Sequence, residues 1–359
     1  MITFFKSTYR RYTNFAIESI ELNFNGTASF GSKTQATISR NGDLVWKMYL
    51  EANLPALAGT GVAYIAEIGH ALVDYVTVSV GGQPIDKHYG EWLSIWNELT
   101  LPTQKQESYN KLIGNTGLLT TPGSSVSGAK VYVPLQFWFN RNPGLSLPLI
   151  ALAYHEVKIE VSFTPLSQLT VGTVTGSPSL GSCSLWIDYI FLDAEERKNF
   201  AQKPQQYLIE QVQFTGTETV SAGAYKSRLS FNHPVKALYW AINPTSAHQL
   251  VFDANGAETI SAATLQLNGN DRFVTRDAAT FNIIQPLQHH TSCPRAGIYV
   301  YSFCLKPEDS QPSGSLNMSK IDNSALSLNV TAAGTLYVFA LSVNIFRAIS
   351  GMGGVTYNS

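Results

Sequence analysis

Short segments in which apolar and polar residues alternate recur along the whole chain. They are rich in Val, Ile, Tyr, Phe and Trp and are bounded by Gly, Pro and Asn, which is typical of β-strands. Helical segments of about 10 to 15 residues do not alternate with them, which favours an all-β fold over a doubly wound parallel sheet. We predict strands over residues 17–24, 44–50, 75–80, 131–139, 157–163, 185–192, 207–214, 237–242, 264–267, 298–305, 326–330 and 335–346.

One amphipathic helix interrupts this pattern in the first half. Its apolar positions fall at i, i+3, i+4 and i+7, at Trp92, Ile95, Trp96 and Leu99. We interpret the two tryptophans as packing against the sheet of their own domain, with an anchor for another subunit as the alternative. At the matching place in the second half, residues 276–287 predict a weaker helix that Pro286 ends.

The order of motifs in the first half returns in the second half. Residues 17–27 resemble residues 209–217, and three further pairs keep the same order: Val78 with Leu265, Tyr132 with Tyr299, and Leu185 with Leu336. The offset shrinks from 192 residues between Ile17 and Ile209 to 151 between Leu185 and Leu336. The second copy has therefore lost loops rather than strands, and two units of one topology are fused in tandem.

A chain of 359 residues is longer than one hydrophobic core usually supports. The repeat therefore predicts a division into two domains, each with its own core. The densest charge cluster lies between the copies and closes with Pro204, which indicates a linker that starts with a helical turn. We predict an N-terminal arm over residues 1–15, a first domain over 16–193, a linker over 194–204 and a second domain over 205–359.

Charge and composition narrow the class of protein. The net charge of −1 and pI near 6.7 provide no general positive field, so we predict no direct contact with nucleic acid. Only 14% of residues are charged, against roughly 25% in an average soluble domain. Either part of the surface contacts neighbours, or a β-rich chain uses Ser, Thr and Asn in place of Glu and Lys.

The cysteines and glycosylation sequons give only limited information on the compartment and modification of the protein. Three widely spaced cysteines without a disulfide framework indicate a reducing compartment. We expect neither a signal peptide nor a membrane span, since no apolar run is long enough. Three Asn-x-Ser/Thr sequons are interpreted as chance occurrences, with glycosylation as the alternative: Asn25, Asn317 and Asn329.

Catalytic motifs are absent from the sequence. It contains neither a Gly-x-Ser-x-Gly elbow nor a phosphate-binding glycine motif. His289, His290 and Cys293 resemble a partial metal site, but adjacent side chains on a strand point to opposite faces and a second ligand pair is missing. We therefore predict no enzyme, no cofactor and no metal site.

The N-terminal arm mixes aromatic and basic residues. The aromatic residues Phe4, Phe5, Tyr9, Tyr12 and Phe15 interleave with the basic residues Lys6, Arg10 and Arg11. This mixture suits a membrane surface, a phosphate-bearing partner or a groove on a neighbouring subunit. The alternative is an arm that packs on its own domain.

A long motif carries a family resemblance. Residues 132–157, YVPLQFWFNRNPGLSLPLIALAYHEV, closely resemble the major capsid proteins of nucleocytoplasmic large DNA viruses, of the iridovirus and phycodnavirus kind. Shorter segments along the whole chain are also similar to that family: residues 4–7, 38–44, 85–92, 231–235, 285–290, 311–323 and 350–354. The family carries exterior decoration on long loops, and the short connections of the second copy depart from that pattern.

The resemblance implies two tandem eight-stranded antiparallel jelly rolls, a double jelly roll, with a few short helices in loops. It implies a structural major capsid protein whose homotrimer forms a pseudo-hexameric capsomer that tiles the icosahedral shell of a large double-stranded DNA virus. The implied location is the virion, after assembly in the host cytoplasm. A minor capsid or vertex protein of the same fold and a jelly-roll carbohydrate-binding protein are the alternatives.

The implied partners are further copies of the chain, minor capsid or cement proteins, penton proteins, and an internal membrane surface contacted by the arm. Ten residues are our assembly or packing candidates: Phe4, Phe5, Lys6, Arg10, Arg11, Trp92, Trp96, Trp138, Asn140 and Arg141. We interpret the polar groups of residues 140–142 and of His155 and Glu156 as turn and interdomain hydrogen-bonding groups.

Overall fold

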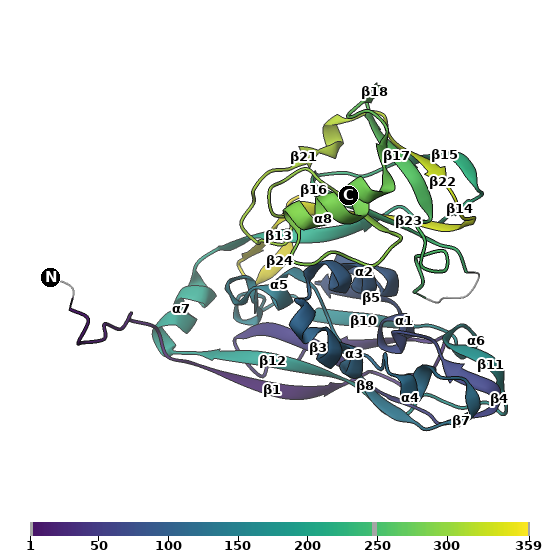
Figure 1. The fold of residues 1–359 in the computed structure, drawn as a ribbon. Helices are drawn as coiled ribbons and strands as arrows, with labels where there is room; N and C mark the ends of the chain where they lie inside the picture. Colours follow the sequence, from purple (N-terminus) through teal and green to yellow (C-terminus); the bar gives the residue numbers. More distant parts are fainter. Residues whose placement is uncertain (1–2, 246–249, 358–359) are drawn as a thin grey trace.

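The computed structural model describes residues 3–245 and 250–357, which form two β-sandwiches lying against each other (Figure 1). The first sandwich is drawn in purple to teal and the second in teal to yellow, and helix α2 lies between them. Within the described residues, no helix is both long enough and apolar enough to cross a membrane.

The first sandwich consists of two antiparallel sheets. One sheet has the order β1 (Phe15–Asn23), β12 (Cys183–Leu192), β3 (Leu44–Leu54) and β8 (Ala129–Pro134), and β9 (Leu147–Pro148) pairs with β3. The other sheet has the order β2 (Lys33–Thr37), β10 (Val157–Phe163), β5 (Val73–Val80) and β6 (Gln83–Tyr89). A small third sheet has the order β11 (Thr170–Val174), β4 (Leu57–Tyr64) and β7 (Gly123–Val126).

The second sandwich repeats this arrangement. Its first sheet has the order β13 (Gln205–Phe214), β23 (Gly334–Ile349), β16 (Pro234–Asn243) and β20 (Ile298–Ser302). The short strands β14 (Glu218–Val220) and β24 (Met352–Val355) pair with β23, and β21 (Leu316–Asn317) pairs with β16. Its second sheet has the order β15 (Gly223–Leu229), β22 (Ser324–Val330), β17 (Ile260–Leu267) and β18 (Asn270–Asp271), and β19 (Arg276–Asp277) pairs with β17.

Both sandwiches therefore use eight principal strands in the same spatial order, which confirms the predicted double jelly roll. In each case the first, last, third and sixth principal strands form one sheet, and the second, seventh, fourth and fifth form the other. Each pair of repeated sequence motifs lies on equivalent strands: β1 and β13, β5 and β17, β8 and β20, and β12 and β23.

Helices occupy the connections. The α-helices are α1 (Ile68–Leu72), α2 (Gly90–Thr100), α3 (Thr103–Leu112), α4 (Gly117–Thr120), α5 (Trp138–Arg141), α6 (Leu166–Leu169), α7 (Ala194–Gln202) and α8 (Gln285–His289). A π-helical turn, η3 (Thr280–Ile284), leads into α8, and 3-10 turns are η1 (Pro143–Leu145), η2 (Leu149–Ala151) and η4 (Met318–Lys320). The charge cluster between the sandwiches is α7, whose first turn is capped by the Asp193 side chain and carries Glu195 and Glu196, which suit the helix dipole.

Several predicted boundaries were wrong. The strand predicted over 131–139 ends at Pro134, and the chain then turns into α5. The strand predicted over 298–305 ends at Ser302. Pro286 does not end its helix, because it lies in the first turn of α8, where a missing N–H is tolerated, and α8 continues to His289.

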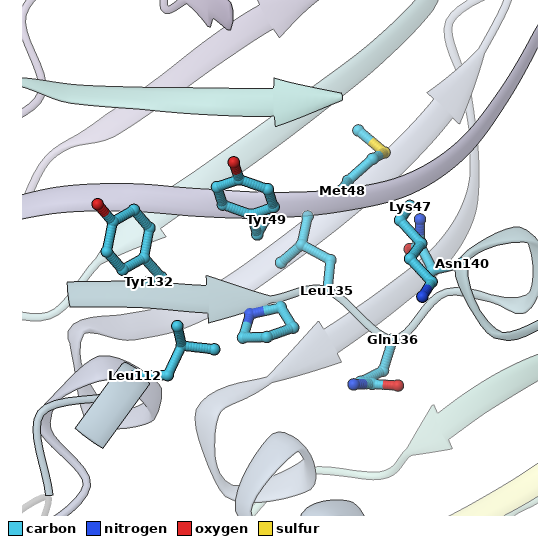
Figure 2. Close-up of a pocket in the computed structure, with 9 residues that line it drawn as sticks. Lys47, Met48, Tyr49, Leu112, Tyr132, Leu135, Gln136 and Asn140 are labelled. Carbon is cyan, nitrogen blue, oxygen red and sulfur yellow. The ribbon is translucent and has the colours of Figure 1, made fainter. Parts of the chain in front are cut away.

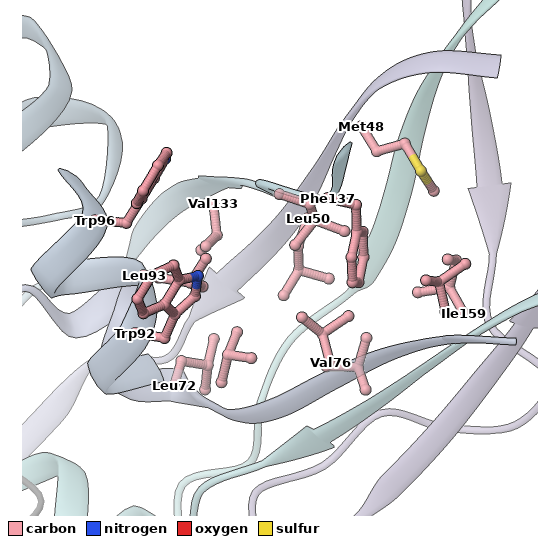
Figure 3. Packing of buried hydrophobic residues seen from close by; sticks show 14 of the residues in the cluster. Met48, Leu50, Leu72, Val76, Trp92, Leu93, Trp96, Val133, Phe137 and Ile159 are labelled. Carbon is pink, nitrogen blue, oxygen red and sulfur yellow. The ribbon is translucent and has the colours of Figure 1, made fainter. Parts of the chain in front are cut away.

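The two faces of strand β16 belong to two different hydrophobic clusters. Leu238, Trp240 and Ile242 point into the core of the second sandwich. Ala237, Tyr239 and Ala241 belong to the cluster that includes the core of the first sandwich, since successive residues of a strand face opposite sides. In that cluster, Trp92 and Leu93 of α2 lie near Leu72 (Figure 3). The outer face of the sheet formed by β13, β23, β16 and β20 is thus buried between the two domains.

Candidate assembly interfaces

Aromatic side chains fill the contact between the two domains. The Trp92 ring lies 5.2 Å from the Tyr239 ring and 5.5 Å from the Phe339 ring, and Trp96 lies 6.3 Å from Tyr239. The expectation that both tryptophans pack within their own domain was incomplete, because their rings also contact the sheet of the second domain. Such buried aromatic contacts make the two sandwiches one packed unit.

The close approach of α2 to the first domain requires a small residue at its start. A side-chain carbon at Gly90 would lie 2.5 Å from the carbonyl oxygen of His70 and 2.6 Å from that of Val73. The glycine lets the helix start against these carbonyl groups, and this placement directs Trp92 and Trp96 at the second domain. Trp138 on α5 supports the same contact, with its ring 6.0 Å from Phe346 of β23.

A charged network joins the domains beside the aromatic contact. The Arg141 guanidinium lies 2.6 Å from a Glu210 carboxylate oxygen, and it also lies over the Trp96 ring at 4.8 Å. Lys236, whose side chain is 1% exposed, donates to the other Glu210 oxygen and to the carbonyl oxygen of Asp309. Because a buried ammonium group is costly without a partner, Glu210 stabilises both cations at once.

The hydrogen-bonding roles expected for residues 140–142 and His155 are observed, whereas the exposed Glu156 pairs with Lys158 of its own domain at 3.3 Å. Asn140 accepts from the backbone N–H of Phe137 at 3.1 Å and so fixes the turn into α5. Asn142 donates to the Ser310 hydroxyl at 2.7 Å, across the domain boundary. Nδ1 of His155 lies 3.0 Å from the Gly353 carbonyl oxygen, also across the boundary.

A second interdomain network centres on the buried Glu67. One carboxylate oxygen accepts from Arg295 of the second domain at 2.8 Å, and the other accepts from Ser94 at 2.6 Å and lies 3.3 Å from Nδ1 of His70. Burial alone would raise the pKa of Glu67, but the contacts with His70, Arg295 and Ser94 together lower it to about 2. The carboxylate is therefore held in its charged form.

The matching outer face of the first domain is only partly covered by the described residues. A groove of about 650 Å³ lies on β3 and β8, beside the C-terminal end of α3. Figure 2 shows Tyr49 and Tyr132 next to each other in this groove, with Leu112 below them and Lys47 and Asn140 at the other end. The Tyr49 ring stacks at 6.2 Å on Trp186, whose indole N–H donates to Glu51 at 3.0 Å.

The N-terminal arm projects away from the body of the molecule (Figure 1). Phe4 is 97% exposed and Phe5 is 99% exposed, and Lys6, Arg10 and Arg11 are exposed as well. Residues 3–14 of the arm are therefore not packed on their own domain, and the strand pairing begins at Phe15. An aromatic arm exposed to this extent is typical of a segment that binds something outside its own chain.

Of the remaining candidates, His290 borders the domain contact, since its ring lies 5.7 Å from the Tyr239 ring. The cysteines Cys183, Cys293 and Cys304 are free. His289 and His290 lie at the end of α8 and not on a strand, and they bind the Leu305 carbonyl oxygen and Glu308 respectively, each at 2.9 Å or less. Asn25 and Asn329 are exposed and Asn317 is half-buried, and their glycosylation stays a prediction.

The sequence did not identify most of the residues that meet Trp92, Trp96 and Arg141 at the domain boundary. Tyr239, Phe339, Glu210, Lys236, Glu67 and Arg295 all lie at the domain boundary and were not candidates. One signal was available, because residues 237–242 are apolar on both faces of the strand. A strand of this kind is covered on both sides.

Comparison with known proteins gives this fold a context. Residues 3–193 match a family model described as the N-terminus of major capsid proteins, and residues 196–354 match one described as the large eukaryotic DNA virus major capsid protein. The major capsid protein of Pyramimonas orientalis virus is 45% identical, over 100% of this chain and 94% of the relative. That of Paramecium bursaria Chlorella virus 1 is 40% identical, over 99% of this chain and 94% of the relative.

Solved structures agree with these sequence matches. A chain in the quasi-atomic model of the PBCV-1 virus capsid superposes with a TM-score of 0.88 at 36% identity, covering 99% of this chain and 100% of that chain. The Faustovirus major capsid protein, at 15% identity, shares the fold with a TM-score of 0.83 over 98% of this chain and 93% of its own.

The fold and its apolar contact surfaces define a structural capsid protein of the double jelly-roll class, which forms part of the virion shell and is not an enzyme. The chain belongs to the family of large eukaryotic DNA virus major capsid proteins. These matches favour the major capsid protein over both alternatives considered from the sequence.

The buried Glu67 carboxylate predicts a pH-dependent stability. Its folded pKa lies below the ordinary 4.5, so its contribution is present above about pH 4.5 and is lost as the pH falls towards 2. The variant Glu67→Gln should be less stable than the wild type by about 3 kcal/mol at pH 7, since Arg295 loses its buried partner. We expect this difference to shrink below pH 4.5, measured by chemical denaturation at each pH.

The exposed Glu107 supplies a matched control, because it pairs with Lys111 on the surface of α3. Glu107→Gln should leave the free energy of unfolding essentially unchanged at any pH. A Glu67→Gln deficit that stays constant from pH 7 to pH 2.5 would show that the charge of Glu67 does not stabilise the domain contact.

Proposed function

We propose that three copies of this chain associate into a closed ring, so that six similar sandwiches form a pseudo-hexagonal capsomer. The observation that carries the proposal is the identical strand order of the two sandwiches within one chain. Three-fold rotation of a two-domain chain then approximates six-fold symmetry. The division into an arm over 1–15, domains over 16–193 and 205–359 and a linker over 194–204 belongs to this proposal.

Hexagonal blocks tile a surface, so the proposed capsomers cover the faces of an icosahedral shell of a large double-stranded DNA virus. Edge strands and apolar side walls are covered in such an assembly, which removes the aggregation hazard of the free chain. Penton proteins at the vertices and minor capsid or cement proteins between capsomers are the further partners that we propose. Assembly takes place in the host cytoplasm in this proposal, in agreement with the three free cysteines.

The N-terminal arm is the proposed contact with an internal membrane. Phe4 and Phe5 supply apolar surface for the interface between headgroups and acyl chains, and Lys6, Arg10 and Arg11 supply attraction to anionic lipid. Each basic residue near an anionic surface contributes about 1 kcal/mol, and a trimer would present three arms at once. Three arms binding together can therefore hold the trimer on a membrane even though each arm binds it weakly.

Purified protein should form a trimer. Light scattering at micromolar concentration should give three times the chain mass of 39.3 kDa, and electron microscopy of concentrated samples should show hexagonal arrays. A stable monomer under these conditions, with no arrays, would contradict the proposed capsomer.

The arm should bind anionic membranes. In flotation with vesicles containing phosphatidylserine, the full chain should float with the vesicles. Two variants should float at least about tenfold less: the double change Phe4→Ser with Phe5→Ser, and the triple change of Lys6, Arg10 and Arg11 to Ala. Lys306→Ala, an exposed lysine outside the arm, serves as the control. Equal flotation of all variants, or none by the wild type, would exclude the membrane contact and leave a protein partner for the arm.

A further inference from the structure

The contact between the two domains consists of a helix of one domain packed on a sheet of the other. The helix that follows the fifth principal strand of the first sandwich, α2, covers the outer face of the other sandwich's sheet. On that face, Tyr239 of β16 pairs in register with Phe339 of β23 on one side and with Val300 of β20 on the other. Trp92 packs on Tyr239 and Phe339, so the contact is a helix seated on an aromatic strand pair.

The first sandwich carries a similar receiving surface, which α3 and α5 border but which no helix of the other sandwich covers within the described residues. Tyr49 of β3 pairs in register with Trp186 of β12 on one side and with Pro134 of β8 on the other, on strands equivalent to those that carry Tyr239, Phe339 and Val300. The groove of about 650 Å³ lies at this position and is lined by Tyr49, Tyr132, Pro134 and Leu112. We call it the outer-sheet groove.

The second sandwich carries the matching helical segment, whose inner side packs on its own domain and whose outer side is exposed. Residues 280–289 form η3 and α8 at the place equivalent to α2. Phe281 and Pro286 are buried against their own domain, whereas Ile283 is 51% exposed and Leu287 is 72% exposed. These two residues have the i, i+4 spacing of Trp92 and Trp96 and therefore share one face of the helix. Together with the exposed Ile284 they form what we call the 283–287 ridge.

We propose that the 283–287 ridge of one copy of this chain occupies the outer-sheet groove of a second copy. The contact between chains then repeats the contact within the chain, with the donor and acceptor domains exchanged. Because the two surfaces differ, the interface is heterologous, and a three-fold rotation closes it into a ring with no ridge or groove left open. This inference rests on the proposed trimer and specifies the residues that form it.

The chemistry of the two surfaces supports this pairing. The groove presents aromatic and aliphatic walls, with Lys47 and Gln136 at its margin, and the ridge presents only aliphatic side chains over three positions. The groove face also carries the Lys130–Glu51 ion pair at 2.6 Å, whereas the equivalent face inside the chain presents Ala237, Tyr239 and Ala241. A more polar surface suits an interface between subunits that must remain soluble before they assemble.

Paired variants test the docking directly. Ile283→Asp with Leu287→Asp alters the ridge, and Tyr49→Ala with Tyr132→Ala alters the groove. Either pair should raise the concentration at which trimers dissociate by about a hundredfold or more, measured by analytical ultracentrifugation. Leu118→Asp, at a position 89% exposed on α4, is the control and should leave the trimer unchanged. Thermal unfolding and circular dichroism check that each variant is folded.

Mixing the two variants gives an outcome that misfolding cannot imitate. The ridge variant keeps an intact groove and the groove variant keeps an intact ridge, so the mixture should form one-to-one heterodimers although each variant alone is monomeric. Trimers formed by the folded ridge or groove variant as readily as by wild type would overturn the inference while leaving the proposed trimer intact. Monomeric variants whose mixture also stays monomeric would overturn it as well. A monomeric wild type would instead overturn the proposed function.

Discussion

Burial of both faces of strand β16 is the constraint on which the rest of the structure depends. One face, with Leu238, Trp240 and Ile242, closes the core of the second sandwich. The other face, with Ala237, Tyr239 and Ala241, must also leave water, and α2 of the first sandwich covers it. Each domain is therefore incomplete as a separate unit, since removing the first would expose a large apolar sheet face.

The polar groups at the same boundary fix how the sandwiches meet. Apolar surfaces alone can slide, whereas the bonds of Glu210 with Arg141 and Lys236, and of Glu67 with Arg295, require one relative position. Their net contribution to stability is small, because desolvating each charge offsets much of the attraction. Their contribution to geometry is large, and a capsomer that tiles a shell depends on a fixed angle between its sandwiches.

The sequence predicted the fold more completely than it predicted the contacts. Alternation placed most principal strands, and the repeat identified equivalent strands correctly, because both signals are local or internal to the chain. Strands 33–37, 83–89, 223–229 and 270–271 were missed, since each carries at most two large apolar residues. Trp92 and Trp96 were identified as packing candidates, but their partner Tyr239 lies more than 140 positions away, and no local pattern pairs residues at that separation. The course of η3 into α8 through Pro286 depends on packing of Phe281 against Trp240, which is likewise a tertiary contact.

The central claim is that one helix-on-sheet contact is used twice, once within each chain and once between chains. An electron cryo-microscopy reconstruction of the purified capsomer tests it most directly. The account predicts three chains, with residues 280–289 of each chain lying over Tyr49 and Tyr132 of the next. A capsomer in which α8 faces solvent, or in which the β3–β8 face contacts a different element, would contradict it.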